Sequence, residues 1–292
     1  MLSPSIGKDL VFTKDALVAG IHFFPDDPAD LIARKAMRVN LSDLAAMGAA
    51  PLGYLLALAL PKDMANRPEW VSHFSRGLKK DQDEFSWSLF GGDTVSTTGP
   101  LTISITAIGT VDHTSALLRS GARLGDDIYV SGTLGDSALG LKCLTGDITP
   151  RNNVLIDRYH LPKPRLELGQ KLKSIASSVM DISDGLAGDI RHICDLSTLG
   201  AEIKETLIPL SLDASKTLER FPSYKSLIWN GGDDYELLFT APCHRAKEID
   251  KLSQDLGLAL TRIGRMTQER DIVIQDQDGQ NLWRDEQGYR HF

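Results

Sequence analysis

The sequence predicts an α+β protein with two lobes. Stretches with a helical hydrophobic period alternate with short apolar runs typical of strands, and one segment alternates apolar and polar residues like an antiparallel strand. The chain has 292 residues, enough for two domains, and residues 112–122 form a polar, irregular stretch between two such sets of elements. We therefore expect an N-terminal domain over 1–113 and a C-terminal domain over 114–292.

The first lobe is expected to alternate strands and helices. Its elements, in order, are a strand at 10–18, an amphipathic helix at 28–47, a buried strand at 53–60, a helix at 68–83, a short strand at 86–90 running into a GGDT turn, and a half-buried antiparallel strand at 101–111.

The second lobe restarts the pattern after the irregular stretch. The expected elements are a strand at 127–131, a Gly-rich turn and helix ending near 144, a helix at 165–176, a strand at 179–182, a helix capped by Ser183 and ending near 196, a strand at 234–240, a helix at 243–256, and strands at 260–265 and 272–275.

Composition excludes several classes of function. A formal charge of −7 argues against a nucleic-acid partner, because such proteins need a positive surface to meet the phosphate backbone. An acidic protein still binds ATP when metal ions bridge the like charges. The sequence contains neither a leader pattern nor an apolar run long enough to span a membrane, so we expect no membrane partner and a cytoplasmic protein.

The three cysteines are widely spaced and show no CxxC pair, as in cytoplasmic proteins whose thiols stay reduced. We interpret Cys143, Cys194 and Cys243 as packing residues rather than disulfide partners or zinc ligands.

Aspartates beside glycine or other small residues are the main functional signal. Carboxylates placed where the backbone can approach a guest closely suit hard cations and phosphates. Each one alone is more typical of a solvated residue or of a carboxylate in the first turn of a helix than of a ligand. The combination of a glycine pair and a carboxylate occurs in both halves of the chain, and this repetition favours a shared cleft. The aspartates are Asp15, Asp43, Asp93, Asp184, Asp233 and Asp234.

Three other residues have open interpretations. His22 is either a capped strand-end residue or a substrate contact, Arg119 a surface cation or a phosphate clamp, and Phe85 a core residue or a plate for a base. The segment 135–142 is not a P-loop, because leucine stands where that loop needs lysine. Neither a dinucleotide fingerprint nor a nucleophile elbow is present.

The order of the motifs resembles that of the thiamine-monophosphate kinase family, part of a superfamily with aminoimidazole ribonucleotide synthetase and selenophosphate synthetase. The resemblance covers nearly the whole chain. It rests on TKDALVAGIHF, VNLSDLAAMGA, GGDT, RSGAR followed by GD, DISDGL, GGDDYEL and the terminal GYRHF.

This resemblance implies a two-lobed fold like that of aminoimidazole ribonucleotide synthetase, with an N-terminal lobe that forms a dimer barrel and a C-terminal α/β lobe. The strand at 101–111 would contribute to the barrel of a homodimer. The implied reaction is phosphorylation of thiamine monophosphate by ATP to give thiamine diphosphate. Several Mg²⁺ ions would assist it, and no general base is required, because the attacking phosphate is already an anion.

The resemblance also assigns residues. The implied metal ligands are Thr13, the backbone of Lys14, Asp15, Asp43, Asp93, Asp181 and Asp184. The implied ATP contacts are Phe85, Gly92, Asp93, Arg119 and Ser183. The implied thiamine monophosphate contacts are His22, Asp233 and an aromatic residue at Tyr289 or Phe292.

Two departures from the family pattern leave alternatives open. Family members carry a GDDAA-like segment with a further aspartate ligand, and Met1 corresponds to a position just after it, so we expect that segment upstream or a chain that lacks one ligand. Asp233 stands where glutamate is common. The alternatives are a sister enzyme acting on aminoimidazole precursors or selenide, and a nucleotide-binding scaffold without catalysis.

Overall fold

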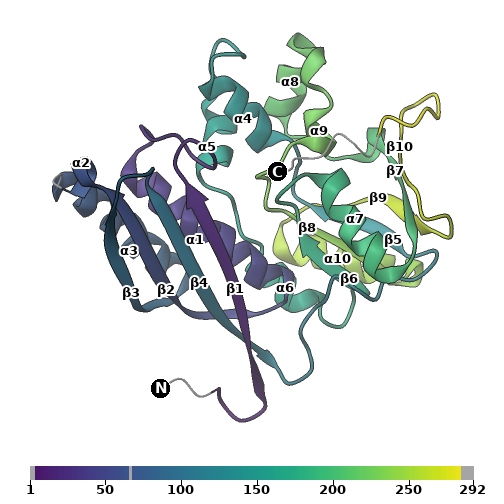
Figure 1. Cartoon of the computed structure of the whole chain (residues 1–292). Helices are drawn as coiled ribbons and strands as arrows, with labels where there is room; N and C mark the ends of the chain where they lie inside the picture. Colours follow the sequence, from purple (N-terminus) through teal and green to yellow (C-terminus); the bar gives the residue numbers. More distant parts are fainter. Residues whose placement is uncertain (1–3, 66–67, 284–292) are drawn as a thin grey trace.

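The structure, a computed structural model, describes residues 4–65 and 68–283 and contains two separate sheets (Figure 1). The four-stranded sheet has the order β1-β4-β2-β3, and the six-stranded sheet has the order β10-β7-β9-β5-β8-β6. Figure 1 shows the first lobe in purple and blue beside the second lobe in teal to yellow. The predicted two-lobed α+β architecture is confirmed. The domain boundary at 113/114 stays a prediction.

In the first lobe, one of the two inner strands is the segment whose alternation of apolar and polar residues was visible in the sequence. β4 (Thr102–Asp112) pairs antiparallel with both β1 (Lys8–Val18) and β2 (Ala50–Pro61), and β2 pairs in parallel with β3 (Ser88–Thr97). Odd-numbered β4 side chains such as Ile103 are buried, because they face the helices.

One face of this sheet is covered by helices and the other is open (Figure 1). α1 (Ala29–Ala46) and α3 (Pro68–Phe85) lie on the covered face, with the short α2 (Lys62–Ala65) after β2. On the open face, Phe12, Leu55 and Val95 keep 58%, 44% and 51% of their surfaces exposed. The expectation that β2 is fully buried is therefore wrong for one of its faces.

The predicted GGDT turn is also wrong, because the motif lies inside β3. Gly91, Gly92 and Asp93 pair in register with Leu55, Leu56 and Ala57 of β2. A Cβ on Gly92 would lie 1.9 Å from the carbonyl oxygen of Leu56. The glycine thus serves close strand pairing rather than chain reversal.

The strands of the second lobe form a mixed sheet. They are β5 (Asp127–Ser131), β6 (Ser178–Asp181), β7 (Gly200–Lys204), β8 (Leu237–Ala241), β9 (Leu260–Thr267) and β10 (Ile272–Gln275). Only β7 was not predicted. It pairs with β9 and β10, and a Cβ on Gly200 would lie 1.8 Å from the carbonyl oxygen of Glu269.

The helices of this lobe depart further from expectation. They are α4 (Asp136–Leu144), α5 (Asn153–His160), α6 (Leu166–Leu172), α7 (Leu186–Ser197), α8 (Leu212–Arg220), α9 (Leu227–Asn230) and α10 (Ala246–Leu256). α5, α8 and α9 were not predicted, although the Asn152 side chain caps α5 and the Ser211 side chain caps α8.

Ser183 does not cap the next helix. α7 begins at Leu186 after Gly185, whose φ of 108° suits glycine, and the backbone N–H of Ser183 instead donates to the Asp189 carboxylate.

Cys143 and Cys194 are buried as expected of packing residues, whereas Cys243 is exposed, so its interpretation as a packing residue is wrong. No helix in the described ranges is long and apolar enough to cross a membrane.

Helix α1 connects the two lobes. Its buried Arg34 and Arg38 both bond Asp81 of α3, which has no exposed surface, and Arg38 also donates to the carbonyl of Pro162 at 3.1 Å. Where α1 meets α6, a Cβ on Gly169 would lie 1.9 Å from the carbonyl oxygen of Ala45. This close approach holds α1 against the second lobe.

The glycine pair in β3 provides a stability test. We expect Gly92→Ala to lower the free energy of unfolding by about 2–4 kcal/mol, because the new Cβ collides with a backbone oxygen of β2. Gly91→Ala is the control, since its Cβ would meet nothing closer than 3.9 Å, and it should change stability by no more than about 1 kcal/mol. Urea unfolding measures the free energy of unfolding of both variants. Equal losses in the two variants would show that the contact with Leu56 does not cause the destabilisation.

Candidate functional site

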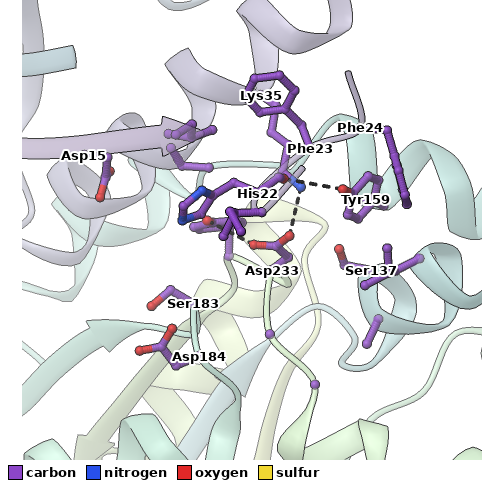
Figure 2. Close-up of a pocket in the computed structure, with 18 of the residues that line it drawn as sticks. Asp15, His22, Phe23, Phe24, Lys35, Ser137, Tyr159, Ser183, Asp184 and Asp233 are labelled. Carbon is purple, nitrogen blue, oxygen red and sulfur yellow. Dashed lines mark hydrogen bonds and ion pairs between the residues drawn. The ribbon is translucent and has the colours of Figure 1, made fainter. Parts of the chain in front are cut away.

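A cavity of about 850 Å³ lies between the two lobes (Figure 2). From the first lobe it is lined by the end of β1, the segment 20–24 and α1. From the second lobe it is lined by α4, Tyr159, and the DISDG and GGDDY loops. This size suits a small-molecule ligand. Most of the predicted motifs therefore meet in one cavity.

Three aspartates from different elements, Asp15, Asp43 and Asp181, form a carboxylate cluster, and Asp15 places this cluster at the cavity lining. Burial first, then the charges of Asp43 and Asp181, raise the pKa of Asp15 to about 7. Burial and the charge of Asp43 likewise raise the pKa of Asp181 to about 7. Burial also raises the pKa of Asp43. Since the charge of Asp43 disfavours ionisation of both Asp15 and Asp181, a bound cation would relieve the repulsion.

Hydroxyl groups hold two of these carboxylates in place. The Oγ1 of Thr13 donates to Asp43 at 2.5 Å, and the Oγ of Ser42 donates to Asp181 at 2.6 Å. The charge of exposed Arg119 lowers the pKa of both carboxyls, against the larger effect of burial.

These oxygen donors fit a hard divalent cation in chemistry and in charge. Among residues 4–65 and 68–283, no three His, Cys, Asp or Glu side chains already form a set arranged around a single ion. The metal assignments stay a prediction.

The DISDG loop adds Ser183 and Asp184 to the cavity wall, on the same side as Asp15 in Figure 2. Their backbone N–H groups donate to the buried Asp189 carboxylate at 3.0 and 3.1 Å. This anchor fixes the loop while the Asp184 side chain stays at the cavity.

The GGDDY loop is bonded directly to the DISDG loop. The N–H of Asp233 donates to the carbonyl of Ser183, and the N–H of Tyr235 donates to the carbonyl of Ile182, both at 2.8 Å. Asp233 and Tyr235 have φ values of 68° and 51°, in the left-handed region that side chains rarely adopt. These bonds keep Asp233 at a fixed place relative to the carboxylate cluster.

Three side chains meet in the middle of the cavity. The Nζ of Lys35 lies 2.8 Å from Oδ2 of Asp233 and 3.6 Å from the centroid of the Tyr159 ring (Figure 2). The hydroxyl of Tyr235 donates to Oδ1 of Asp233 at 3.2 Å. His22 also lines the cavity, and its Nδ1 accepts the N–H of Val18 at 3.0 Å.

Sequence reasoning missed Lys35 and Tyr159. The helical period of α1 places Lys35 on the apolar face of the helix. A lysine at a position expected to be buried could have indicated a functional residue. Tyr159 lies in α5, a helix that was not predicted.

The structure does not bring Asp93 to the carboxylate cluster. Asp93 is in register with Ala57, Ser104 and Ala16, and this row of side chains lies on the open face of the sheet. Asp15 belongs to the neighbouring row on the opposite face. The open face also carries the amine of Lys14, which donates to Ser104 at 2.9 Å.

The remaining predicted residues lie elsewhere. Gly92 pairs with β2, and the ring of Phe85, at the end of α3, lies 5.1 Å from the guanidinium carbon of Arg38. Phe85 therefore packs in the first lobe away from the cavity lining. Tyr289 and Phe292 lie outside the described residues.

Known proteins resemble this chain along nearly its whole length. The family described as AIR synthase related protein, N-terminal domain, matches residues 1–111, and the one described as AIR synthase related protein, C-terminal domain, matches residues 123–277. Thiamine-monophosphate kinase of Escherichia coli K12 is 43% identical, over 98% of this chain and 87% of the relative.

Solved structures show the same similarity. Thiamine-monophosphate kinase from Stenotrophomonas maltophilia K279a superposes with a TM-score of 0.88 at 38% identity, covering 97% of this chain and 89% of that one. A structure described as AaThiL complexed with AMPPCP and TMP gives a TM-score of 0.87 at 31% identity, covering 99% and 89%.

The carboxylate cluster predicts a pH-dependent stability effect. The pKa of Asp15 in the folded protein, about 7, exceeds its ordinary value of 3.8, so ionisation destabilises the fold increasingly as pH rises between these values. We expect Asp15→Asn to raise the stability of the metal-free protein by roughly 1–3 kcal/mol at pH 8 and by much less at pH 4.5. Thermal melting in chelator measures both.

Asp9→Asn is the control for this experiment. The pKa of exposed Asp9 is lowered by a hydrogen bond from His113, so its replacement should give no stabilisation at pH 8. Destabilisation by Asp15→Asn at pH 8 would contradict repulsion within the cluster.

Proposed function

The chain belongs to the thiamine-monophosphate kinase family, and on that premise we propose that it transfers the γ-phosphoryl group of ATP to thiamine monophosphate. The products are thiamine diphosphate and ADP. The observation that carries this proposal is the cavity between the lobes, whose lining contains both Asp15 of the carboxylate cluster and Asp233.

The residue types match the chemistry of this reaction. The substrate phosphate has a second pKa near 6, so at neutral pH it is largely a dianion and needs no general base to attack. The obstacle is repulsion between two polyanions, which bound Mg²⁺ would offset. Asp15, Asp43, Asp181 and Asp184 would hold the ions, together with Thr13.

Other residues would bind and orient the two substrates. Ser183 and Arg119 would contact the phosphates of ATP, one from the cavity wall and one from beside the carboxylates. His22 and Asp233 would contact thiamine monophosphate. The bonds between the two motif loops would keep the substrate phosphate aligned with the metal ligands.

We also propose a homodimer formed through the open face of the first sheet. Phe12, Leu55 and Val95 leave apolar surface there that a second copy would cover. Asp93 lies on that face, so its contact with metal and ATP would arise at the dimer interface.

We further propose a cytoplasmic location, which agrees with the free thiols of Cys143, Cys194 and Cys243.

The activity has a direct test. ADP formation should require both thiamine monophosphate and Mg²⁺, and Asp43→Asn and Asp93→Asn should each lower kcat about 100-fold or more while the melting curve stays cooperative. Asp9→Asn, an exposed carboxylate outside the cavity, is the control and should keep normal activity. Purified protein and a coupled ADP assay suffice.

Different outcomes separate the alternatives. Turnover with aminoimidazole precursors or selenide instead would assign the chain to a sister activity. ATP binding in calorimetry without product would favour a scaffold. Wild-type activity in Asp93→Asn would remove that residue from the metal site.

The dimer proposal predicts that charge on the open face disrupts assembly. We expect Val95→Glu to shift the protein to monomer in light scattering, because the carboxylate would be buried without a partner at the interface. Leu212→Glu changes a leucine on α8 that is more exposed than Val95, and it should leave the assembly unchanged. A wild-type monomer would overturn the proposal.

A further inference from the structure

Lys35 is a buried cation in the wall of the cavity. Its side chain is only 3% exposed, although lysine normally keeps its ammonium in water. The partners in place of water are the carboxylate of Asp233 at 2.8 Å and the face of the Tyr159 ring at 3.6 Å (Figure 2). A carboxylate and an aromatic face together make a binding site for a cation.

The proposed substrate also carries a cation, the thiazolium ring of thiamine monophosphate. That ring would be attracted to the same two groups, Asp233 by charge and Tyr159 by stacking. Lys35 already neutralises Asp233, so adding the thiazolium beside it would place two positive charges around one carboxylate. The thiazolium ring therefore binds well only if the Lys35 ammonium pairs with a different anion.

The substrate brings that anion with it. Lys35 and Val39 both line the cavity from α1, and Asp43 of the carboxylate cluster follows about two turns after Lys35, about 12 Å along the axis and about 80° around it. A phosphate bound between Lys35 and the proposed metal ions would lie within reach of the flexible lysine stem.

The other lysines of the lining have different partners. Lys142 bonds Asp147 at 3.1 Å, and Lys14 donates to Ser104 on the open face of the sheet. Among the described lining residues, Lys35 is thus the cation that contacts the proposed substrate carboxylate.

We propose that the thiazolium displaces the Lys35 ammonium from Asp233 and Tyr159, and that Lys35 then binds the phosphate of the same substrate molecule. This inference rests on the proposed function. Without substrate, the Lys35 ammonium occupies the place where the thiazolium binds. With substrate bound, the same ammonium contacts the substrate phosphate. The exchange favours a ligand that has both charges, and so selects thiamine monophosphate over thiamine.

The test compares two ligands in calorimetry without Mg²⁺. In Lys35→Met, the Kd of thiamine monophosphate should rise at least about tenfold, because the phosphate loses a charged partner. The Kd of thiamine should fall or stay unchanged, because no ammonium competes for Asp233 and Tyr159. A merely structural role would weaken both ligands alike, and that result would overturn the proposal.

Lys142→Met is the matched control, since it removes another lysine from the same lining. It should leave the ratio of the two affinities as in the wild type. If Lys142→Met, rather than Lys35→Met, selectively weakens the binding of thiamine monophosphate, then Lys35 is not the phosphate ligand. Lys35→Arg retains a cation and should retain a preference for the phosphorylated ligand.

The wild-type protein offers a second measurement that does not depend on folding of a variant. Inorganic phosphate should tighten thiamine binding about fivefold or more, because it gives Lys35 an alternative partner. Independent binding, or competition between phosphate and thiamine, would overturn the exchange. If the wild type phosphorylates thiamine monophosphate but phosphate does not tighten thiamine binding, only the exchange is refuted. If the wild type shows no turnover at all, the proposed function is refuted.

Discussion

The packing of α1 between the two lobes is the constraint on which the rest of the structure depends. The helix covers the first sheet on one side and meets α6 and β6 of the second lobe on the other. Contact at Gly169 is so close that even a methyl group would collide with the Ala45 carbonyl. Because both lobes pack on one rigid helix, residues far apart in the sequence share a cavity.

Burial of α1 has consequences for its charged residues. Arg34 and Arg38 are desolvated and find carboxylate partners in α3, which ties the helix to the first lobe. Lys35 lines the cavity instead, and Asp43 belongs to the carboxylate cluster with Asp15. The same helix thus carries structural ion pairs and also the two residues that we propose as contacts of substrate and metal.

Sequence reasoning located most strands, since their apolar runs are short and well bounded. It failed where backbone contacts decide the conformation. GGDT was expected to turn, but its glycines permit strand pairing against Leu56. α5 and α8 were overlooked because they are short, and Tyr159 was overlooked with α5. Ser183 was assigned to a cap, whereas a buried Asp189 binds its N–H.

The sequence by itself determined the chemistry of this protein, because the residue types and the order of the motifs specify carboxylates, a family and a reaction. Only the tertiary structure decided which carboxylates lie close together. Asp15, Asp43 and Asp181 meet because strand, helix and sheet edge converge, while Asp93 lies on the other face of its sheet, since side chains alternate along a strand. The partnership of Lys35 with Asp233 and Tyr159 is likewise a product of packing across the lobes, which local sequence patterns do not encode.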